Sequence, residues 1–382
     1  MNRKVLMVST ASRWLGTARM PRSLALAGFD VSLLAPRGSL ALHSSFVSRS
    51  SVLRDESTPM QWLLSLVAMI TEIEPRLVVP CDEVAIRLLF ELVRHPPRHL
   101  DGNSGAPIVQ LVRQSLGDPA HYETSIDKTV LPAAARALGV PVPPYAVTEN
   151  VDEAVAHADA LGYPVVLKRR YGFASQGVRI VQRRDDLRAA ADVLLHPVQL
   201  DLGVRRPPAL LVQGFVDGPM VSQTMVAWEG VPLAGFTRQR EIPFMPGLGA
   251  SAVVRVRKVP AIRDYTERLC RAFGMSGFFS VQFIAPASGG PPVLLEINRR
   301  IVTFMHTDEY GGVDLCGALF RRLAGLPQTL AIDMPDGADQ VIVSFPREWL
   351  RDPESAWLHS HPSDIPWDDP GVFEAMVALR NE

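Results

Sequence analysis

Four polar residues in two neighbouring apolar segments have side chains suited to phosphate and metal chemistry. Gln282 lies in the segment 280–284 (SVQFI), and Glu296, Asn298 and Arg300 alternate with other residues in the segment 294–300 (LLEINRR). In an extended strand every second side chain points to the same face, so these last three residues share one face. The turn-forming residues 287–290 (ASGG) join the two segments, which places Gln282 beside that face.

One carboxylate and two amide oxygens form a set of hard ligands that suits Mg²⁺, with Mn²⁺ as an alternative ion. Arg300, at the end of the same face, would neutralise charge on a phosphoryl group in transfer. The same residues would also suit the solvated face of an ordinary hairpin. The spacing alone therefore leaves both hypotheses open.

Two further segments have features of a nucleotide site. The apolar run 165–168 ends in Lys168, and small residues follow it in 171–178 (YGFASQGV), where backbone N–H groups could approach phosphate oxygens. The chain contains no G-x-x-x-x-G-K-[ST] motif, so this is not a Walker A loop. The apolar run 210–216 contains Gln213 near its end, which would let its amide and the backbone contact adenine. A hairpin with a surface lysine and a plain core strand are the alternatives.

The order of these segments, preceded by Asp127-Lys128 and by 139–143 (GVPVP), resembles the ATP-grasp superfamily, specifically its carbamoyl phosphate synthetase-like branch. The resemblance extends over residues 127–327 and includes the segment 311–315 (GGVDL). It implies an ATP-dependent ligase that joins a carboxylate to an amine or a related nucleophile. Such an enzyme acts through an acylphosphate and releases ADP and phosphate.

The resemblance also implies roles for individual residues. The nucleotide would contact Lys128, Lys168, Ser175, Gly177, Gln213, Phe215 and Val216. The metal ligands would be Gln282, Glu296 and Asn298, and the catalytic residues Arg300, Lys168 and Arg240. Arg240 belongs to the charged segment 238–240, which would bind an anionic substrate facing the γ-phosphate; a solvated charged strand is the alternative. Many members carry Glu at the positions of Gln213 and Gln282, and several carry an acidic residue at Ser222.

The elements that must position these residues change in character along the chain. Apolar β-rich runs at 4–9, 31–35 and 77–80 alternate with helical patterns, which predicts a parallel, Rossmann-like sheet. Short strands dominate beyond residue 127, apart from helices predicted at 128–138 and 151–161. The predicted fold class is therefore α/β and α+β, an ATP-grasp fold with an N-terminal Rossmann-like pre-ATP domain. The predicted boundaries are 1–110 for that domain, 111–205 and 206–330 for the two lobes, and 331–382 for a loosely packed, proline-containing C-terminal extension.

The amino-acid composition limits which functions and which cellular locations we expect for this protein. The chain has 382 residues with 40 acidic and 39 basic side chains, so we expect no nucleic-acid binding. The basic residues comprise 35 arginines and only 4 lysines, two of which occupy the phosphate positions of the resemblance. Three distant cysteines indicate neither a disulfide framework nor a zinc site. The longest apolar stretch, 62–70, is too short to span a bilayer, and the N-terminus lacks a secretory pattern.

We therefore expect a cytoplasmic enzyme without membrane contact that acts on a small-molecule carboxylate and amine, with a homodimer allowed. Two alternatives remain. One is a dinucleotide-dependent oxidoreductase built on residues 1–100, although the first loop contains only Gly16 and no G-x-G-x-x-G. The other is a nucleotide-binding module with weak or lost catalysis, which the departures at Gln213 and Ser222 allow.

Overall fold

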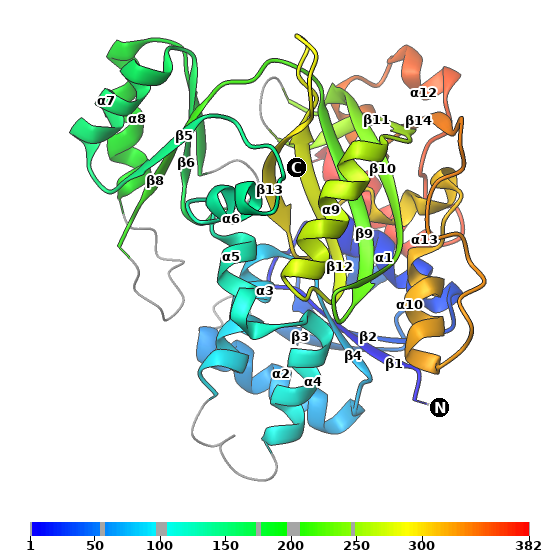
Figure 1. Ribbon diagram of the computed structural model, residues 1–382. Helices are drawn as coiled ribbons and strands as arrows, with labels where there is room; N and C mark the ends of the chain where they lie inside the picture. The colour runs from blue at the N-terminus through cyan, green and yellow to red at the C-terminus, as the bar shows by residue number, and fades with distance from the viewer. Residues whose placement is uncertain are drawn as a thin grey trace.

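The computed structural model describes residues 2–53, 58–96, 105–172, 177–196, 207–245 and 249–381 and contains three sheets (Figure 1). The first sheet is parallel, in the order β3-β2-β1-β4, as the alternating pattern predicts. Its strands are β1 (Lys4–Val8), β2 (Asp30–Pro36), β3 (Arg49–Leu53) and β4 (Leu77–Pro80). Its helices are α1 (Leu15–Leu26), η1 (Leu40–His43), α2 (Pro59–Ile73), α3 (Glu83–Arg94) and α4 (Ala106–Leu116).

Alternation along β1 explains why this sheet has helices on both faces. Val5 and Met7 pack with α1 in one core cluster, whereas Leu6 and Val8 pack with α2, α3 and α4 in another. Strands buried on both faces are expected to be apolar throughout, as β4 is and as β1 is beyond its exposed first residue, Lys4. The carboxyl ends of these strands lie at one edge, where ligands of parallel sheets usually bind.

The second sheet, β5-β8-β6-β7, lies at the upper left of Figure 1. It comprises β5 (Tyr145–Thr148), β6 (Val165–Arg169), β7 (Val178–Val181) and β8 (Leu210–Gly214). The helices α7 (Val151–Leu161) and α8 (Arg184–Leu195) cover one face through a small apolar core. Three elements connect this sheet to the first: η3 (Pro119–His121), α5 (Tyr122–Ile126) and α6 (Leu131–Ala137).

The third sheet is antiparallel, in the order β13-β12-β9-β10-β11-β14. Its strands are β9 (Met220–Trp228), β10 (Val231–Pro243), β11 (Ser251–Arg257), β12 (Gly277–Ile284), β13 (Val293–Asn298) and β14 (Asp339–Val343). Odd-numbered residues such as Val221, Phe279 and Val281 pack on α6 and α9 (Pro260–Ala272). Even-numbered residues such as Val226 and Phe278 pack on α1, η4 (Met305–Gly311) and α10 (Leu315–Ala324).

The prediction of a loosely packed C-terminal extension over residues 331–382 is wrong, because this segment packs against the rest of the chain. β14 pairs with β11, and Phe345, Val372 and Met376 share a core with Leu15 and Ala18 of the first domain. The segment contains four short helices: α11 (Arg347–Arg351), α12 (Ala356–Ser360), α13 (Pro370–Ala378) and η5 (Leu379–Asn381). Prolines lie between the first three. The predicted domain boundaries stay a prediction.

Three smaller observations concern the predicted helix start, the cysteines and membrane spans. The helix predicted from residue 128 begins at Leu131, because the Asp127 carboxylate accepts hydrogen bonds from the backbone N–H and hydroxyl of Thr129 and holds a turn there. The cysteines Cys81, Cys270 and Cys316 are free and buried. Across the described ranges, no helix combines the length and apolar character needed to cross a membrane.

Candidate functional site

The third sheet aligns four polar residues in one row. Strand register pairs Glu296 of β13 with Gln282 of β12, Gln282 with Ser222 of β9, and Ser222 with Arg238 of β10. The next row on the same face contains Asn298, which pairs with Ser280. The predicted juxtaposition of Gln282 with Glu296 and Asn298 is therefore present.

Gln282 and Glu296 of this row, together with Asn298, line a cavity of about 110 Å³. The cavity brings together most of the residues that the sequence singled out: Lys128, Lys168, Gly177, Arg240, Gln282, Glu296, Asn298 and Arg300. Gly172, Val178, Met220, Gly249 and Leu295 complete the lining. Residues from the second and third sheets, and from loops far apart in the sequence, thus surround a single small polar volume.

Lys168 enters the cavity from the end of β6, where it pairs with Val178 and Leu211. Its side chain is buried, so its ammonium group has lost most of its contact with water. Burial lowers the pKa of Lys168 to about 8; the carboxylate of Glu296 opposes this shift and the charge of Lys128 adds to it. A bound anion would restore the charged form of this lysine.

Lys128 lies in the turn that precedes α6 and also lines the cavity. Asp127 fixes this turn, because its carboxylate also accepts a hydrogen bond from Arg170 at 2.6 Å. The Lys128 ammonium donates to the carbonyl oxygen of Gly172 at 2.9 Å and lies 3.4 Å from Oε2 of Glu296. Lys128 therefore connects the loop after β6 with the carboxylate on β13.

Glu296 is held in its ionised form. Burial would raise its pKa, but Lys128, Lys168, the Asn298 side chain and Arg300 together hold the pKa below its ordinary value. Its Oε1 atom accepts a hydrogen bond from Nδ2 of Asn298 at 3.2 Å. An ionised carboxylate beside two amide oxygens has the chemistry that Mg²⁺ prefers. The three residues therefore fit the predicted set of Mg²⁺ ligands. This set has a single negative charge, so a phosphate would neutralise the remaining charge of the metal ion.

Arg300 is fixed by Asn298 and by two residues that the sequence did not single out, Glu83 and Trp14. Its Nε atom lies 3.4 Å from Oε2 of Glu83, and its Nη2 donates to Oδ1 of Asn298 at 3.1 Å. The ring of Trp14 covers the guanidinium, 5.0 Å from centroid to Cζ. Glu83 and Trp14 both follow carboxyl ends of the first parallel sheet, and that position is the signal by which they could have been found.

A larger cavity of about 590 Å³ adjoins the smaller one and shares its lining at Gln282, Glu296, Asn298, Arg300 and Arg240. Arg240 lies at the junction, with Nε donating to the Ser251 hydroxyl at 3.2 Å and Nη2 donating to the carbonyl oxygen of Gly249. Arg238, Ser222 and Arg347 line only the larger cavity. Arg347 has no sequence pattern that marks it.

The residues predicted to contact adenine lie apart from both cavities. Gln213 is buried at the end of β8, between Tyr145 and Val166. The N–H of Phe215 donates to the carbonyl oxygen of Pro164 at 3.3 Å, and Val216 follows it, half-buried. Their contact with a base stays a prediction. Ser175 of the predicted lid lies outside the described residues.

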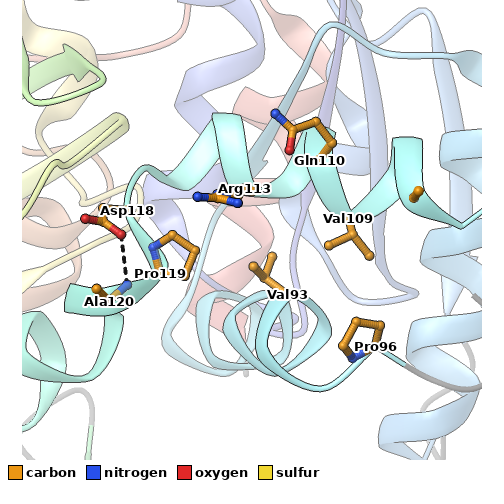
Figure 2. A pocket seen from close by; sticks show the side chains of 9 residues that line it. Val93, Pro96, Val109, Gln110, Arg113, Asp118, Pro119 and Ala120 are labelled. Atoms are coloured by element: carbon orange, nitrogen blue, oxygen red, sulfur yellow. Dashed lines mark hydrogen bonds between the residues drawn. The ribbon is translucent and has the colours of Figure 1, made fainter. Parts of the chain in front are cut away.

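A further hollow, of about 600 Å³, lies between α3, α4 and η3 (Figure 2). Arg113 and Asp118 are its charged lining residues within the described ranges. Oδ1 of Asp118 already accepts a hydrogen bond from the N–H of Ala120 at 3.0 Å. None of the residues predicted to do chemistry lines this hollow.

Comparison with known proteins gives two matching family models. Residues 127–219 match the carbamoyl-phosphate synthase L chain ATP-binding domain, and residues 206–343 match the ATP-grasp in the biosynthetic pathway with Ter operon. The two matches together include every predicted site residue.

Relatives agree with these matches over part of their length. The chain is 29% identical over 187 residues to the protein y4rH of Sinorhizobium fredii, and 24% identical over 181 residues to the carbamoyl phosphate synthase large chain of Thermus thermophilus. These alignments cover 48% and 46% of this chain, and 38% and 17% of the relatives, so the chain spans well under half of either relative.

A solved structure has the same fold. The biotin carboxylase domain of 2-oxoglutarate carboxylase from Hydrogenobacter thermophilus, a dimer in complex with MgADP, ADP and bicarbonate, superposes with a TM-score of 0.64 at 17% identity. The superposition covers 89% of this chain and 74% of that one. The predicted combination of an α/β domain with an ATP-grasp fold is confirmed.

Proposed function

The chain belongs to the ATP-grasp superfamily, and from this premise we propose that it is an ADP-forming ligase that joins a carboxylate to an amine or a related nucleophile. The observation that supports the proposal is the convergence of Lys128, Lys168, Glu296 and Arg300 around one cavity. Phosphoryl transfer depends on positioning and on neutralising charge, which these groups provide. The proposed reaction passes through an acylphosphate.

The phosphates of ATP would lie between the two lysines. Lys168 gains a counter-charge from them, and Lys128 reaches them from the opposite side of the same cavity. Gln282, Glu296 and Asn298 would hold Mg²⁺, which when bound supplies positive charge to the phosphate oxygens. The base would lie towards Gln213, Phe215 and Val216, at the end of β8.

The substrate carboxylate would approach from the larger cavity. One of its oxygens attacks the γ-phosphorus, the bond from that phosphorus to the bridging oxygen breaks, and ADP leaves. Arg300, held by Glu83, neutralises charge on the transferring group, and Arg240 holds the carboxylate at the junction of the cavities. The amine nitrogen then attacks the acyl carbon, phosphate leaves with the carboxylate oxygen, and the amine loses a proton to give the amide.

The oxidoreductase alternative requires a pyrophosphate at the loop after β1. The Asp82 carboxylate already accepts hydrogen bonds there from the N–H groups of Thr10, at 2.6 Å, and of Ala11, at 3.1 Å. The Ser9 hydroxyl also donates a hydrogen bond to the Asp82 carboxylate, at 2.8 Å. Because the negatively charged Asp82 carboxylate already occupies these N–H donors, it disfavours the binding of a phosphate at this position.

A screen for ADP release tests the proposal. Purified protein with Mg·ATP is incubated with a panel of carboxylic acids and a mixed amine pool, and ADP is measured with a coupled assay. We expect release that depends on both substrates and that Glu296→Ala or Lys168→Ala abolishes while the circular dichroism spectrum stays unchanged. Lys258→Ala, at a surface lysine paired with Asp333 and Asp336, is the matched control. Normal turnover by either site variant would refute the site, and tight ATP binding without turnover would favour a binding module.

A further inference from the structure

The lining of the larger cavity combines charged, polar and apolar side chains. Glu296, Asn298 and Arg300 lie at the end shared with the phosphate site, and Arg238 and Arg347 line it elsewhere. Apolar wall residues include Val302, Phe304, Leu350 and Leu379. Its volume of about 590 Å³ lies within the usual range for pockets that enclose a small organic molecule.

Positive charge in this cavity exceeds negative charge. Five arginines line it, namely Arg13, Arg238, Arg240, Arg300 and Arg347, and among the described residues Glu296 is the one carboxylate in the lining. Arg300 has Glu83 as an ion-pair partner. Within the described part of the chain, Arg238, Arg240 and Arg347 form no ion pair at 4.0 Å or less.

Arg238 is the least compensated of these side chains. It is 8% exposed, its Nη1 atom has no hydrogen-bond partner among the described residues, and its Cζ lies 5.5 Å from the ring centroid of Phe304. Burial, together with the charges of Arg347 and Arg240, lowers its pKa to about 9. A buried cation without a counter-charge is unfavourable, and a bound anion would remove that cost.

Arg347 is buried as well, at 7% exposure, and its Nη1 donates to the carbonyl oxygen of Ser251 at 3.4 Å. Burial lowers its pKa to about 10, an effect that Asp364 opposes and Arg240 reinforces. A small anion beside Glu296 would lie far along the sheet from Arg238. β13 and β10 are three strands apart, so the backbones of Glu296 and Arg238 are separated by about 14 Å.

We propose that the carboxylate substrate carries a second anionic group, which Arg238 and Arg347 bind while the reacting carboxylate lies near Arg300 and Arg240. The part between the two anions is apolar and packs against Val302 and Phe304. The substrate class is therefore a dicarboxylate, or a carboxylate that bears a phosphate. This inference rests on the proposed function, and it separates the reaction from the use of bicarbonate, which has no second anionic group.

Binding without turnover tests the inference separately from the ligase reaction. The full chain with a non-hydrolysable ATP analogue and Mg²⁺ is titrated by calorimetry with succinate, glutarate, adipate and 3-phosphoglycerate, each beside a monocarboxylate of equal carbon number. We expect at least one dianion to bind about tenfold or more tightly than its monoanionic counterpart. Arg347→Met should weaken that dianion about 10–100-fold and leave the monoanion unchanged.

Controls separate a binding role from a structural one. Arg238→Met should give the same selective loss, and Arg257→Met, at an exposed arginine of β11, should change neither affinity. Equal affinity for dianions and monoanions, equal losses for both in Arg347→Met, or no binding by any dianion would overturn the inference. ADP release with monocarboxylates alone would overturn it while the ligase function stands. Selective dianion binding without ADP release would support it while the ligase function fails.

Discussion

Lys168 makes nucleotide affinity depend on pH in a range where the phosphates themselves do not titrate. Its pKa is lowered to about 8, chiefly by burial, in the protein without nucleotide. The phosphates of ADP would favour its charged form and raise that pKa to the ordinary value or above. Nucleotide binding should therefore take up protons, and affinity should fall as pH rises through 8.

The size of the effect follows from the shift. At pH 8 about half of the free protein has a neutral Lys168, so binding takes up about 0.5 proton; at pH 9 the uptake is about 0.9 proton. The apparent Kd should be about tenfold higher at pH 9 than at pH 7, which corresponds to about 1.4 kcal/mol.

Calorimetry with ADP and a metal chelator measures both quantities, when each pH is repeated in buffers with different ionisation enthalpies. Metal-free ADP keeps metal binding out of the proton balance. Lys168→Met should bind ADP weakly at every pH with no uptake above pH 8, and Lys258→Met should behave as the wild type. A constant Kd between pH 7 and pH 9, or unchanged uptake in Lys168→Met, would refute the reasoning.

Three further predictions concern residues around the site and the C-terminal segment. Glu83→Gln removes the charge that holds Arg300, so kcat should fall about tenfold with the KM for ATP unchanged; an unchanged kcat would contradict that positioning role. Arg238→Met removes an uncompensated buried charge and should stabilise the ligand-free protein by about 1–3 kcal/mol, seen as a higher Tm; a lower Tm would contradict this account. Phe345→Ala should destabilise the protein by about 3–5 kcal/mol in urea unfolding, because its ring packs between Trp349 and Phe373; a loss below about 1 kcal/mol would indicate a loose segment.

The parts of the site that follow from local periodicity could be predicted from the sequence. The alternation in 294–300 and the turn at 287–290 predicted that Gln282 would lie beside Glu296 and Asn298, because side-chain direction in a strand depends on residue parity. Lys168 lines the cavity as well, and its position at the end of an apolar run predicted a place at the edge of the sheet. The alternating pattern of residues 4–80 likewise predicted the parallel sheet.

The remaining parts depend on contacts between distant segments. Glu83 contacts Arg300 across 217 positions, and its place at a helix N-terminus gave no sign of that partner. Arg347 reaches the larger cavity because β14, shortly before it in the chain, pairs with β11 at the edge of the third sheet. The prolines around this segment gave no indication of a strand there. Packing of Phe345 against Leu15 is a similar long-range contact.

Transfer of ¹⁸O from the substrate carboxylate to phosphate tests the central claim most directly. The protein is incubated with Mg·ATP, an amine and a carboxylate labelled with ¹⁸O, and the released phosphate is analysed by mass spectrometry. An acylphosphate predicts one labelled oxygen in each phosphate formed with the amide, and no labelled phosphate from Glu296→Ala. Release of ADP with unlabelled phosphate, or equal label transfer by the variant, would contradict the proposed ligase.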